Sequence, residues 1–323
     1  MTEDKYPLVA IGVPVYNGAE FLDECLTSLC NQTYTNWCCI ILDNCSNDGS
    51  GEIAKKFVHK DTRFIYESND KLLDVMLNWN KVFSFIPAET RYFKIIPADD
   101  WIMPEFLAEM VSTMERNPKA GICSSYRIDD SKVRGEGLNW YEGNYFSGKR
   151  VLTDELNLKI DVTGSGNSVL YKVSYLKLLP KFPQIFSSES IHGDTELAYD
   201  LLSVCDLAFI YKVLSYTRRH EASITTRIAS KLNTSACFRD NMFLKYADII
   251  ENFEGNYRQH RLSYATFYMK KLFSGDKKSL QWHTENLKNP ILKTEIIAAI
   301  LNLIFVKIFR RSLTFKLNNI PVV

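Results

Sequence analysis

The stretch Tyr92-Phe93-Lys94-Ile95-Ile96-Pro97-Ala98-Asp99-Asp100 decides the fold class of this chain. It begins as a short, mainly apolar run, which is typical of a buried strand, and it ends in two adjacent carboxylates. A helix is predicted after it, from Glu105 to Asn117, because Pro104 suits the first turn of a helix. In open α/β sheets, ligands bind beyond the carboxyl ends of the strands, so we expect a binding site where this strand ends.

The two adjacent carboxylates, Asp99 and Asp100, predict a divalent cation. Neighbouring carboxylates raise each other's pKa unless a cation neutralises them. Mg²⁺ and Mn²⁺ prefer oxygen ligands and usually bind one or two carboxylates together with substrate phosphates. We therefore expect a site for a metal and a diphosphate. The alternative is a solvated turn in which an Asp caps the helix that follows.

Apolar runs and helical periodicities alternate on both sides of this stretch. Strands are predicted at 8–15, 37–42, 64–66, 121–126, 166–171 and 207–216, and helices at 19–31, 51–59, 71–85 and 194–204. The alternation of strand and helix up to residue 96 is typical of a doubly wound, mostly parallel α/β sheet. Residues 127–150 show no clear periodicity, and we expect them to form either a long functional loop or a mobile segment.

The composition and the periodicity of the sequence change near residue 230. From about residue 231 glycine becomes scarce and apolar residues recur at helical spacing. We therefore predict an α/β domain at 1–230 and a helical C-terminal region at 231–323.

The most apolar part of this C-terminal region is 291–311. On a helical wheel one face collects Ile297, Leu301, Ile304, Phe305 and Ile308, and basic residues follow at Lys307, Arg310, Arg311 and Lys316. This pattern predicts that 291–316 lies on an anionic membrane surface. The alternative is a helix packed on the α/β domain or in a dimer interface.

Composition argues against several classes of protein. The 323 residues are 46% hydrophobic, which is enough for a substantial core. The net charge of +1 gives no support to nucleic-acid binding. The eight cysteines form no CxxC pair, and residues 1–7 lack the apolar segment of a signal peptide. A cytoplasmic location is therefore expected.

Polar clusters follow three of the predicted strands, and an acidic residue opens a later helix. The clusters are Pro14–Asn17, Asp43–Ser50 and Ala98–Asp100, and the acidic residue is Asp194. Two further motifs accompany them, Asn78-Trp79-Asn80-Lys81 and Tyr216-x-Arg218-x-His220-x-x-Ser223. In this order and spacing, residues 7–223, about two thirds of the chain, resemble family 2 glycosyltransferases of the GT-A fold.

The resemblance implies roles for individual positions. The residues that would bind a nucleotide-sugar donor are Pro14, Val15, Tyr16, Asn17, Asp43, Asn80, Asp99, Arg218 and His220. Asp100 and Asp99 would hold Mn²⁺ or Mg²⁺, and Asp194 would be the general base. Many relatives carry an acid in place of Pro97 or Asn44 and a Glu in place of Gly193. In this chain the metal site therefore depends on Asp99 and Asp100 alone.

Several of these residues also have an ordinary structural interpretation. Asp43 and Ser46 could form a turn in which the carboxylate binds nearby backbone. Asp194 could serve only as a helix cap, and His220 could be a surface histidine.

The resemblance, with the residues that carry it, implies an inverting, metal-dependent glycosyltransferase. It would move a sugar from a nucleoside-diphosphate sugar to a hydroxyl of a glycan or lipid-linked acceptor, in cell-surface polysaccharide synthesis at the inner face of a membrane. Asp43 could accept the imide N–H of uracil or thymine, which favours uridine or thymidine diphosphate sugars.

Two alternatives remain at this level. One is an inactive module that binds nucleotide-sugars or glycans. The other is a sugar nucleotidyltransferase, which would need a glycine-rich basic loop after the first strand. Residues 16–20 contain no basic side chain, which argues against the second alternative.

Overall fold

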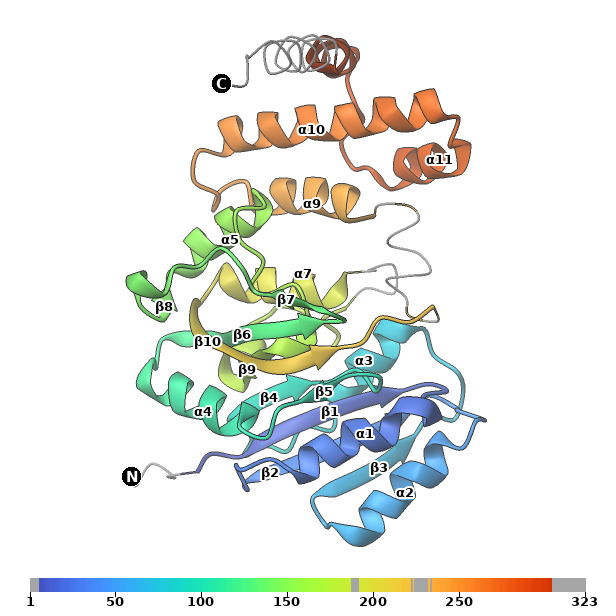
Figure 1. Ribbon diagram of the computed structural model, residues 1–323, viewed down its shortest axis with the longest axis vertical. Helices are drawn as coiled ribbons and strands as arrows, with labels where there is room; N and C mark the ends of the chain where they lie inside the picture. The colour runs from blue at the N-terminus through green and yellow to red at the C-terminus, as the bar shows by residue number, and fades with distance from the viewer. Residues whose placement is uncertain (1–5, 187–191, 222, 224–231, 233, 304–323) are drawn as a thin grey trace, which may run out of the picture. The chain divides into compact units, whose positions relative to one another are not determined.

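A computed structural model of the chain (Figure 1) describes residues 6–186, 192–221, 223, 232 and 234–303. The chain divides into two compact units, Met1–His220 and Glu221–Val323. The predicted boundary near residue 230 lies outside the described residues and stays a prediction.

The first unit is built on one large sheet, in which the strand order is β3-β2-β1-β4-β9-β6-β10-β5 and β7 and β8 pair beside it. The strands are β1 (Val9–Val15), β2 (Trp37–Asp43), β3 (Phe64–Ser68), β4 (Tyr92–Ile95), β5 (Trp101–Ile102), β6 (Ala120–Asp129), β7 (Lys132–Arg134), β8 (Tyr145–Phe146), β9 (Val169–Lys172) and β10 (Asp206–Thr217). The adjacent strands β3, β2, β1 and β4 are parallel to one another, and β6 is parallel to β10. Strand β9 lies between β4 and β6 and is antiparallel to both. The predicted mostly parallel α/β sheet is confirmed.

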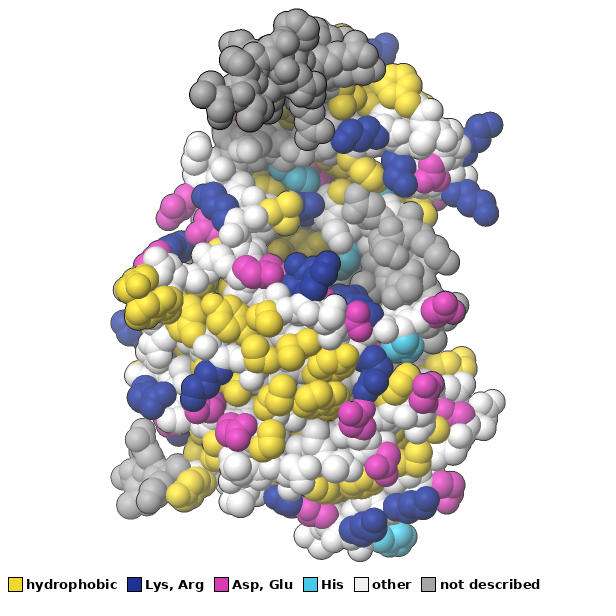
Figure 2. All heavy atoms as spheres, viewed as in Figure 1, with side chains coloured by type: hydrophobic (Ala, Val, Ile, Leu, Met, Phe, Trp, Pro, Cys, Tyr) yellow, Lys and Arg dark blue, Asp and Glu magenta, His cyan; other side chains and the backbone are white. Residues whose placement is uncertain are grey.

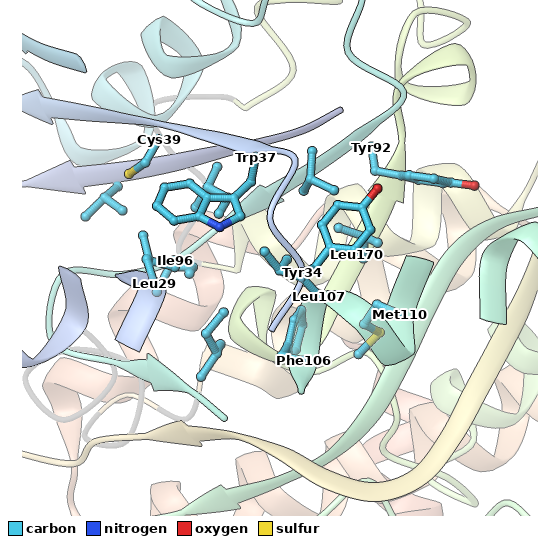
Figure 3. Close-up of a cluster of buried hydrophobic side chains, with 14 of the residues drawn as sticks. Leu29, Tyr34, Trp37, Cys39, Tyr92, Ile96, Phe106, Leu107, Met110 and Leu170 are labelled. Carbon is cyan, nitrogen blue, oxygen red and sulfur yellow. The ribbon is translucent and has the colours of Figure 1, made fainter. Parts of the chain in front are cut away.

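Helices cover both faces of this sheet (Figure 1). They are α1 (Ala19–Cys30), α2 (Ser50–Lys60), α3 (Val75–Phe83), α4 (Phe106–Arg116), α5 (Gly148–Leu156), α6 (Val173–Leu176) and α7 (Gly193–Leu202). A large core lies between the sheet and α1, α2 and α4, and Figure 3 shows Trp37, Tyr92 and Phe106 within it. On the opposite face, the Phe83 ring of α3 lies 5.0 Å from the Phe93 ring.

Strand β1 is apolar throughout because both of its faces are covered. Val9, Ile11 and Val13 belong to the large core. Successive side chains of a strand point to opposite faces, so Gly12 faces α3 instead. Continuous apolar strands of this kind are typical of parallel sheets with helices on both sides.

Gly12 is needed because α3 crosses β1 closely at this point. A Cβ atom at Gly12 would lie 2.2 Å from Cγ1 of Val82 and 3.3 Å from Cζ of Phe93. We expect Gly12→Ala to lower the free energy of unfolding by about 1–3 kcal/mol, the usual cost of overpacking a core, as measured by denaturant unfolding. Combining it with Val82→Ala relieves the overlap, so the double variant should lose less than the sum of the two single losses. Additive losses would contradict this explanation.

Three predicted elements differ in the structure. The helix predicted at 71–85 begins only at Val75, because the Asp74 side chain accepts a hydrogen bond from the Met76 N–H and caps it. Residues 127–150 are not one long loop: pairing with β6 and β10 orders them into β7, β8 and the start of α5. The strand predicted at 166–171 begins only at Val169, after a 3-10 turn at Gly166–Ser168.

The second unit is helical in its described part. It contains α9 (Thr234–Lys245), α10 (Phe253–Ser274), α11 (Lys277–Asn286) and a helical stretch at 293–303. Arg261, which is 3% exposed, holds these parts together. Its guanidinium donates hydrogen bonds to the carboxylates of Asp240 and Glu295 and to the carbonyl of Asn289.

Part of the face predicted to contact a membrane is described. Ile297 and Leu301 are 57% and 62% exposed, whereas Ala299 packs against α10 in a small apolar cluster. Outside the described residues lie the other members of that face, Ile304, Phe305 and Ile308, and the basic residues Lys307, Arg310, Arg311 and Lys316. Within the described ranges, no helix is both long enough and apolar enough to cross a membrane.

Candidate active site

The carboxyl ends of β1, β2, β4 and β10 lie at one edge of the sheet, and the loops that follow them are bonded to one another. The Asn17 N–H donates to Ser46 Oγ at 2.9 Å, which ties the loop after β1 to the loop after β2. The Arg218 N–H donates to Asp100 Oδ1 at 2.9 Å, across 118 positions of sequence. Figure 2 shows acidic, basic and histidine side chains gathered where β10 ends. The structure thus brings together residues that the sequence only suggested as separate clusters.

Asp43 ends β2 and is 4% exposed. Its Oδ1 accepts a hydrogen bond from the Ser46 N–H and its Oδ2 accepts one from the Tyr66 hydroxyl, both at 2.9 Å. The turn that was the structural alternative for this residue is therefore present. A carboxylate has about four lone-pair sites, so Asp43 keeps acceptor capacity for a ligand N–H. Tyr66, on β3, was missed by sequence reasoning because nothing local connects it with Asp43.

The loop after β1 contains one left-handed residue and is held by hydrogen bonds to the neighbouring loop. Pro14 and Val15 are the last residues of β1 and are buried. Asn17 has a φ of 49°, a left-handed conformation that asparagine tolerates better than most residues. Its Oδ1 accepts a hydrogen bond from the Asn47 N–H at 3.0 Å. Tyr16 is left 52% exposed at the edge of the sheet.

Asp100 is buried, with 3% of its surface exposed. Burial, and next the charge of Asp99, raise the pKa of Asp100 well above its usual range. The hydrogen bonds from the Arg218 N–H and the Thr217 hydroxyl oppose this rise. The carboxyl is therefore held in a place where an added positive charge would favour its ionised form.

Asp99 and Arg218 form the centre of a small polar cluster. Asp99 Oδ2 lies 2.9 Å from His220 Nε2, and the Asp99 carbonyl accepts a hydrogen bond from Arg218 Nε at 3.1 Å. From α1, Glu24 forms an ion pair with Arg218, and the Phe21 ring lies 4.7 Å from the guanidinium carbon. Glu24 and Phe21 gave no signal in the sequence, because they are ordinary positions of an amphipathic helix.

The acidic residues at this edge can be tested for their fit to a metal. Within the residues that the structure describes, no group of three or more His, Cys, Asp and Glu side chains is arranged as a metal site. Asp99 and Asp100 thus supply two carboxylates, the number that Mg²⁺ or Mn²⁺ often uses when phosphates and water complete its shell. The raised pKa of Asp100 agrees with this interpretation. The side chains therefore fit a cation that is shared with a bound diphosphate.

Asp194 is the second residue of α7, and the residue that caps this helix is His192. The N-cap position of α7 is thus occupied by His192, and Asp194 lies in the first turn of the helix. Its Oδ2 accepts a hydrogen bond from the Gly166 N–H at 3.1 Å, and its Oδ1 accepts one from the Thr195 N–H at 2.8 Å. The first turn of a helix also favours negative charge. Asp194 is thus a fixed carboxylate whose position depends on the turn at Gly166–Ser168.

Asn80 is 1% exposed on α3. Its side-chain oxygen accepts a hydrogen bond from the Phe186 N–H at 2.8 Å, and its Nδ2 donates to the Phe186 carbonyl at 2.7 Å. In this structure Asn80 ties α3 to a segment more than a hundred residues away. Its role in donor binding stays a prediction.

Glu155 of α5 orders the segment that leads to the turn at Gly166–Ser168. Its Oε1 accepts hydrogen bonds from the N–H groups of Val162 and Thr163, at 2.8 and 2.9 Å. Burial, and next the charge of Asp161, raise the pKa of Glu155 to about 7.

The raised pKa of Glu155 predicts that stability falls as pH rises from 4.5 to about 7. In that range the folded state binds this proton more tightly than the unfolded chain, so the free energy of unfolding decreases with pH. Glu155→Gln keeps an acceptor oxygen but cannot titrate. Between pH 5 and 7.5, wild type should therefore lose roughly 1–3 kcal/mol more than Glu155→Gln in denaturant unfolding. Parallel pH profiles would contradict this prediction.

Comparison with known proteins gives a consistent result. Residues 10–175 match the sequence model of the family described as glycosyl transferase family 2. The chain is 34% identical over 129 residues to the uncharacterized glycosyltransferase MJ1057 of Methanocaldococcus jannaschii, which covers 39% of this chain and 44% of that protein. It is 25% identical over 222 residues to the glycosyltransferase GlyG of Streptococcus pneumoniae, covering 67% and 72%. The match thus spans less than half of the length of the first relative.

Solved structures share the fold. TarS 1-349 of S. aureus superposes with a TM-score of 0.59 at 15% identity, covering 79% of this chain and 72% of that one. The mannosyltransferase PcManGT of Pyrobaculum calidifontis, solved with GDP-Man and Mn²⁺, gives a TM-score of 0.54 at 15% identity, covering 93% and 87%. TarS 1-349 has also been solved with UDP-GlcNAc, with a TM-score of 0.57, 13% identity and coverage of 86% and 90%. The expected GT-A fold is confirmed.

Proposed function

Because the chain belongs to glycosyl transferase family 2 and is a glycosyltransferase, we propose that it moves a sugar from a nucleoside-diphosphate sugar to an acceptor hydroxyl, with inversion and with a divalent cation. The acceptor class that we propose is a glycan or a lipid-linked sugar of the cell surface. One observation carries the proposal: Asp99, Asp100, Arg218 and His220 form one bonded cluster at the carboxyl edge of the sheet. Ligands of open α/β sheets bind at that edge.

The donor class is supported by the chemistry of the loops after β1 and β2. Asp43 has acceptor capacity for the imide N–H of a pyrimidine, and the exposed ring of Tyr16 offers a surface for a base. Structural neighbours of this chain were solved with UDP, UDP-GlcNAc and GDP-Man. We therefore propose a nucleoside-diphosphate sugar as donor, with uridine or thymidine preferred as the nucleoside.

The proposed reaction develops negative charge on the departing diphosphate. Arg218 supplies N–H donors and positive charge beside Asp99, and His220 supplies a ring nitrogen there, where the diphosphate would lie. A divalent cation held by Asp100 and Asp99 would act there as a Lewis acid. Asp194 would accept the proton of the acceptor hydroxyl as that oxygen attacks the anomeric carbon. Attack opposite the leaving group inverts the configuration at that carbon.

A thermal-shift screen of the full chain against nucleoside diphosphates, with and without Mn²⁺, tests the donor site. Binding to the folded state raises the melting temperature. We expect uridine or thymidine diphosphate to raise it, and the rise to depend on Mn²⁺. A donor-hydrolysis assay with Mn²⁺ then separates an active enzyme from an inactive binding module. No shift with any nucleoside diphosphate would contradict the proposal.

We also propose that residues 291–316 bring the enzyme to a membrane surface, where a lipid-linked acceptor would be found. The exposure of Ile297 and Leu301 supports this, because apolar side chains on one helix face favour an interface. The full chain should float with liposomes of anionic lipid, and a truncation at about residue 290 should stay in solution. Equal behaviour of the two would end the membrane proposal and favour the alternative of a packed or dimer-forming helix.

A further inference from the structure

Lys94 is a fully buried lysine that lies close in sequence to the acidic pair of the cluster described above. It lies on β4, six positions before Asp100, and none of its surface is exposed. Its Nζ donates a hydrogen bond to the Asn167 carbonyl at 2.6 Å and lies 3.5 Å from the carbonyl oxygens of Gly166 and Val169. The ammonium also lies 4.2 Å from the centre of the Phe106 ring. Since an ammonium has three N–H donors, three carbonyls and an aromatic face make a complete set of partners.

The carbonyls that bind Lys94 belong to the turn Gly166–Ser168 and to the first residue of β9. The same turn contacts Asp194, because the Gly166 N–H donates to Asp194 Oδ2. It also contacts the strands beside the cluster, since Asn167 Nδ2 donates to the Tyr216 carbonyl at 2.8 Å and lies 3.3 Å from the Trp101 carbonyl. The turn therefore connects Asp194 with the residues that flank Asp100 and Arg218.

Placing a lysine here is costly. Burial lowers the pKa of Lys94 well below its usual range, although the charge of Asp100 opposes this effect. An apolar side chain of similar length would fill the space without that cost. A hydrophobic residue could not, however, bind the carbonyls of Gly166, Asn167 and Val169.

We propose that Lys94 is a positioning residue for sugar transfer, which fixes the turn Gly166–Ser168 and through it the carboxylate of Asp194. It acts through the turn and touches neither the donor nor the acceptor. The inference rests on the proposed function, because it takes Asp194 as the general base. Its consequence is selective: turnover depends on Lys94, whereas metal-free binding of the nucleoside part, which uses the loops after β1 and β2, does not.

Lys94→Met tests this selectivity, because methionine is similar in length but has no N–H donor. We expect kcat to fall roughly 10–100-fold, because small misplacements of a reacting group have effects of this size. The Kd of the nucleoside diphosphate, measured by calorimetry without Mn²⁺, should not change. Gly12→Ala is the matched control, since it destabilises the same sheet without contacting the turn. If Lys94→Met does not fold, Lys94→Gln, which keeps two N–H donors, should show a smaller loss of the same kind.

Hydrogen–deuterium exchange provides a readout that does not require activity. In the Lys94 variant, amides of 163–169 should exchange faster, while those of β2 remain as protected as in wild type. Unchanged exchange in 163–169 would overturn the inference. Equal losses of kcat and of nucleotide affinity in the Lys94 variant would also overturn it, and so would a loss of kcat in Gly12→Ala as large as that in the Lys94 variant. A wild-type enzyme without transfer or hydrolysis would contradict the proposed function instead, and the exchange result would still decide whether Lys94 holds the turn.

Discussion

Asp194→Asn is expected to lower turnover by roughly 10²–10⁴-fold, the usual contribution of a general base, without changing the affinity for a nucleoside diphosphate. Both oxygens of Asp194 accept backbone hydrogen bonds, from Gly166 and Thr195. Neither partner belongs to the loops after β1 and β2, to which we assign the nucleoside. The substitution therefore removes the proton acceptor and leaves the donor site in place.

The control for this prediction is Glu196→Gln on the same helix. Glu196 lies two positions after Asp194, and residues at that spacing do not face each other, so its replacement should cost far less turnover. Asn at 194 keeps one acceptor oxygen but places an NH₂ group against a backbone donor, so a modest fall in melting temperature is expected. Near-normal turnover in Asp194→Asn would remove the base from this residue and with it the proposed mechanism.

Asp100→Asn is expected to abolish the Mn²⁺-dependent part of nucleoside-diphosphate binding. Removing one partner of a buried, bonded pair of charges costs about 2–5 kcal/mol, and a calorimetric titration with and without Mn²⁺ measures this loss directly. The fold should survive, because an amide oxygen can still accept the hydrogen bond from the Arg218 N–H. Since the variant also loses a carboxyl group whose burial is unfavourable, its melting temperature without metal should equal or exceed that of wild type.

Asp99→Asn is the comparison for Asp100→Asn, because the two positions are adjacent but differ in their surroundings. Asp99 is bonded to His220 and is more exposed than Asp100. We expect its replacement to weaken use of the donor with less effect on the metal. Unchanged diphosphate affinity in Asp100→Asn, with and without Mn²⁺, would rule out Asp100 as the ligand.

The core of the α/β unit was predictable because it follows from local patterns. The strands at 8–15 and 37–42 appear in the structure within one or two residues of their predicted bounds. Buried parallel strands are apolar on both faces, so a short continuous run identifies them. The polar residues that end these runs had to meet at one edge, since parallel strands share the direction of their carboxyl ends.

The elements that were predicted poorly depend on distant partners. The strand at Val169–Lys172 runs antiparallel between two parallel strands, and its run of residues looks like that of any other strand. Strands β7 and β8 are only two or three residues long. They form because their backbone pairs with that of β6 and β10, respectively. No pattern within 127–150 could show those edges.

Local patterns were enough to predict the parallel sheet and the acidic residues at its carboxyl edge, because each follows from residues that are close together in the chain. The family follows from the order and spacing of motifs along residues 7–223. Which atoms meet depends on tertiary contacts: Arg218 with Asp99 and Asp100, Asp194 with Gly166, and Lys94 with the carbonyl of Asn167 in the same turn. The physical reason is that a buried charge is stable only where packing brings donors or acceptors to it, and those groups lie far away in sequence. Lys94 is the one charged residue in an apolar strand. Its hydrogen-bond partner lies in a turn that follows it by more than seventy residues, so the sequence near Lys94 does not explain it.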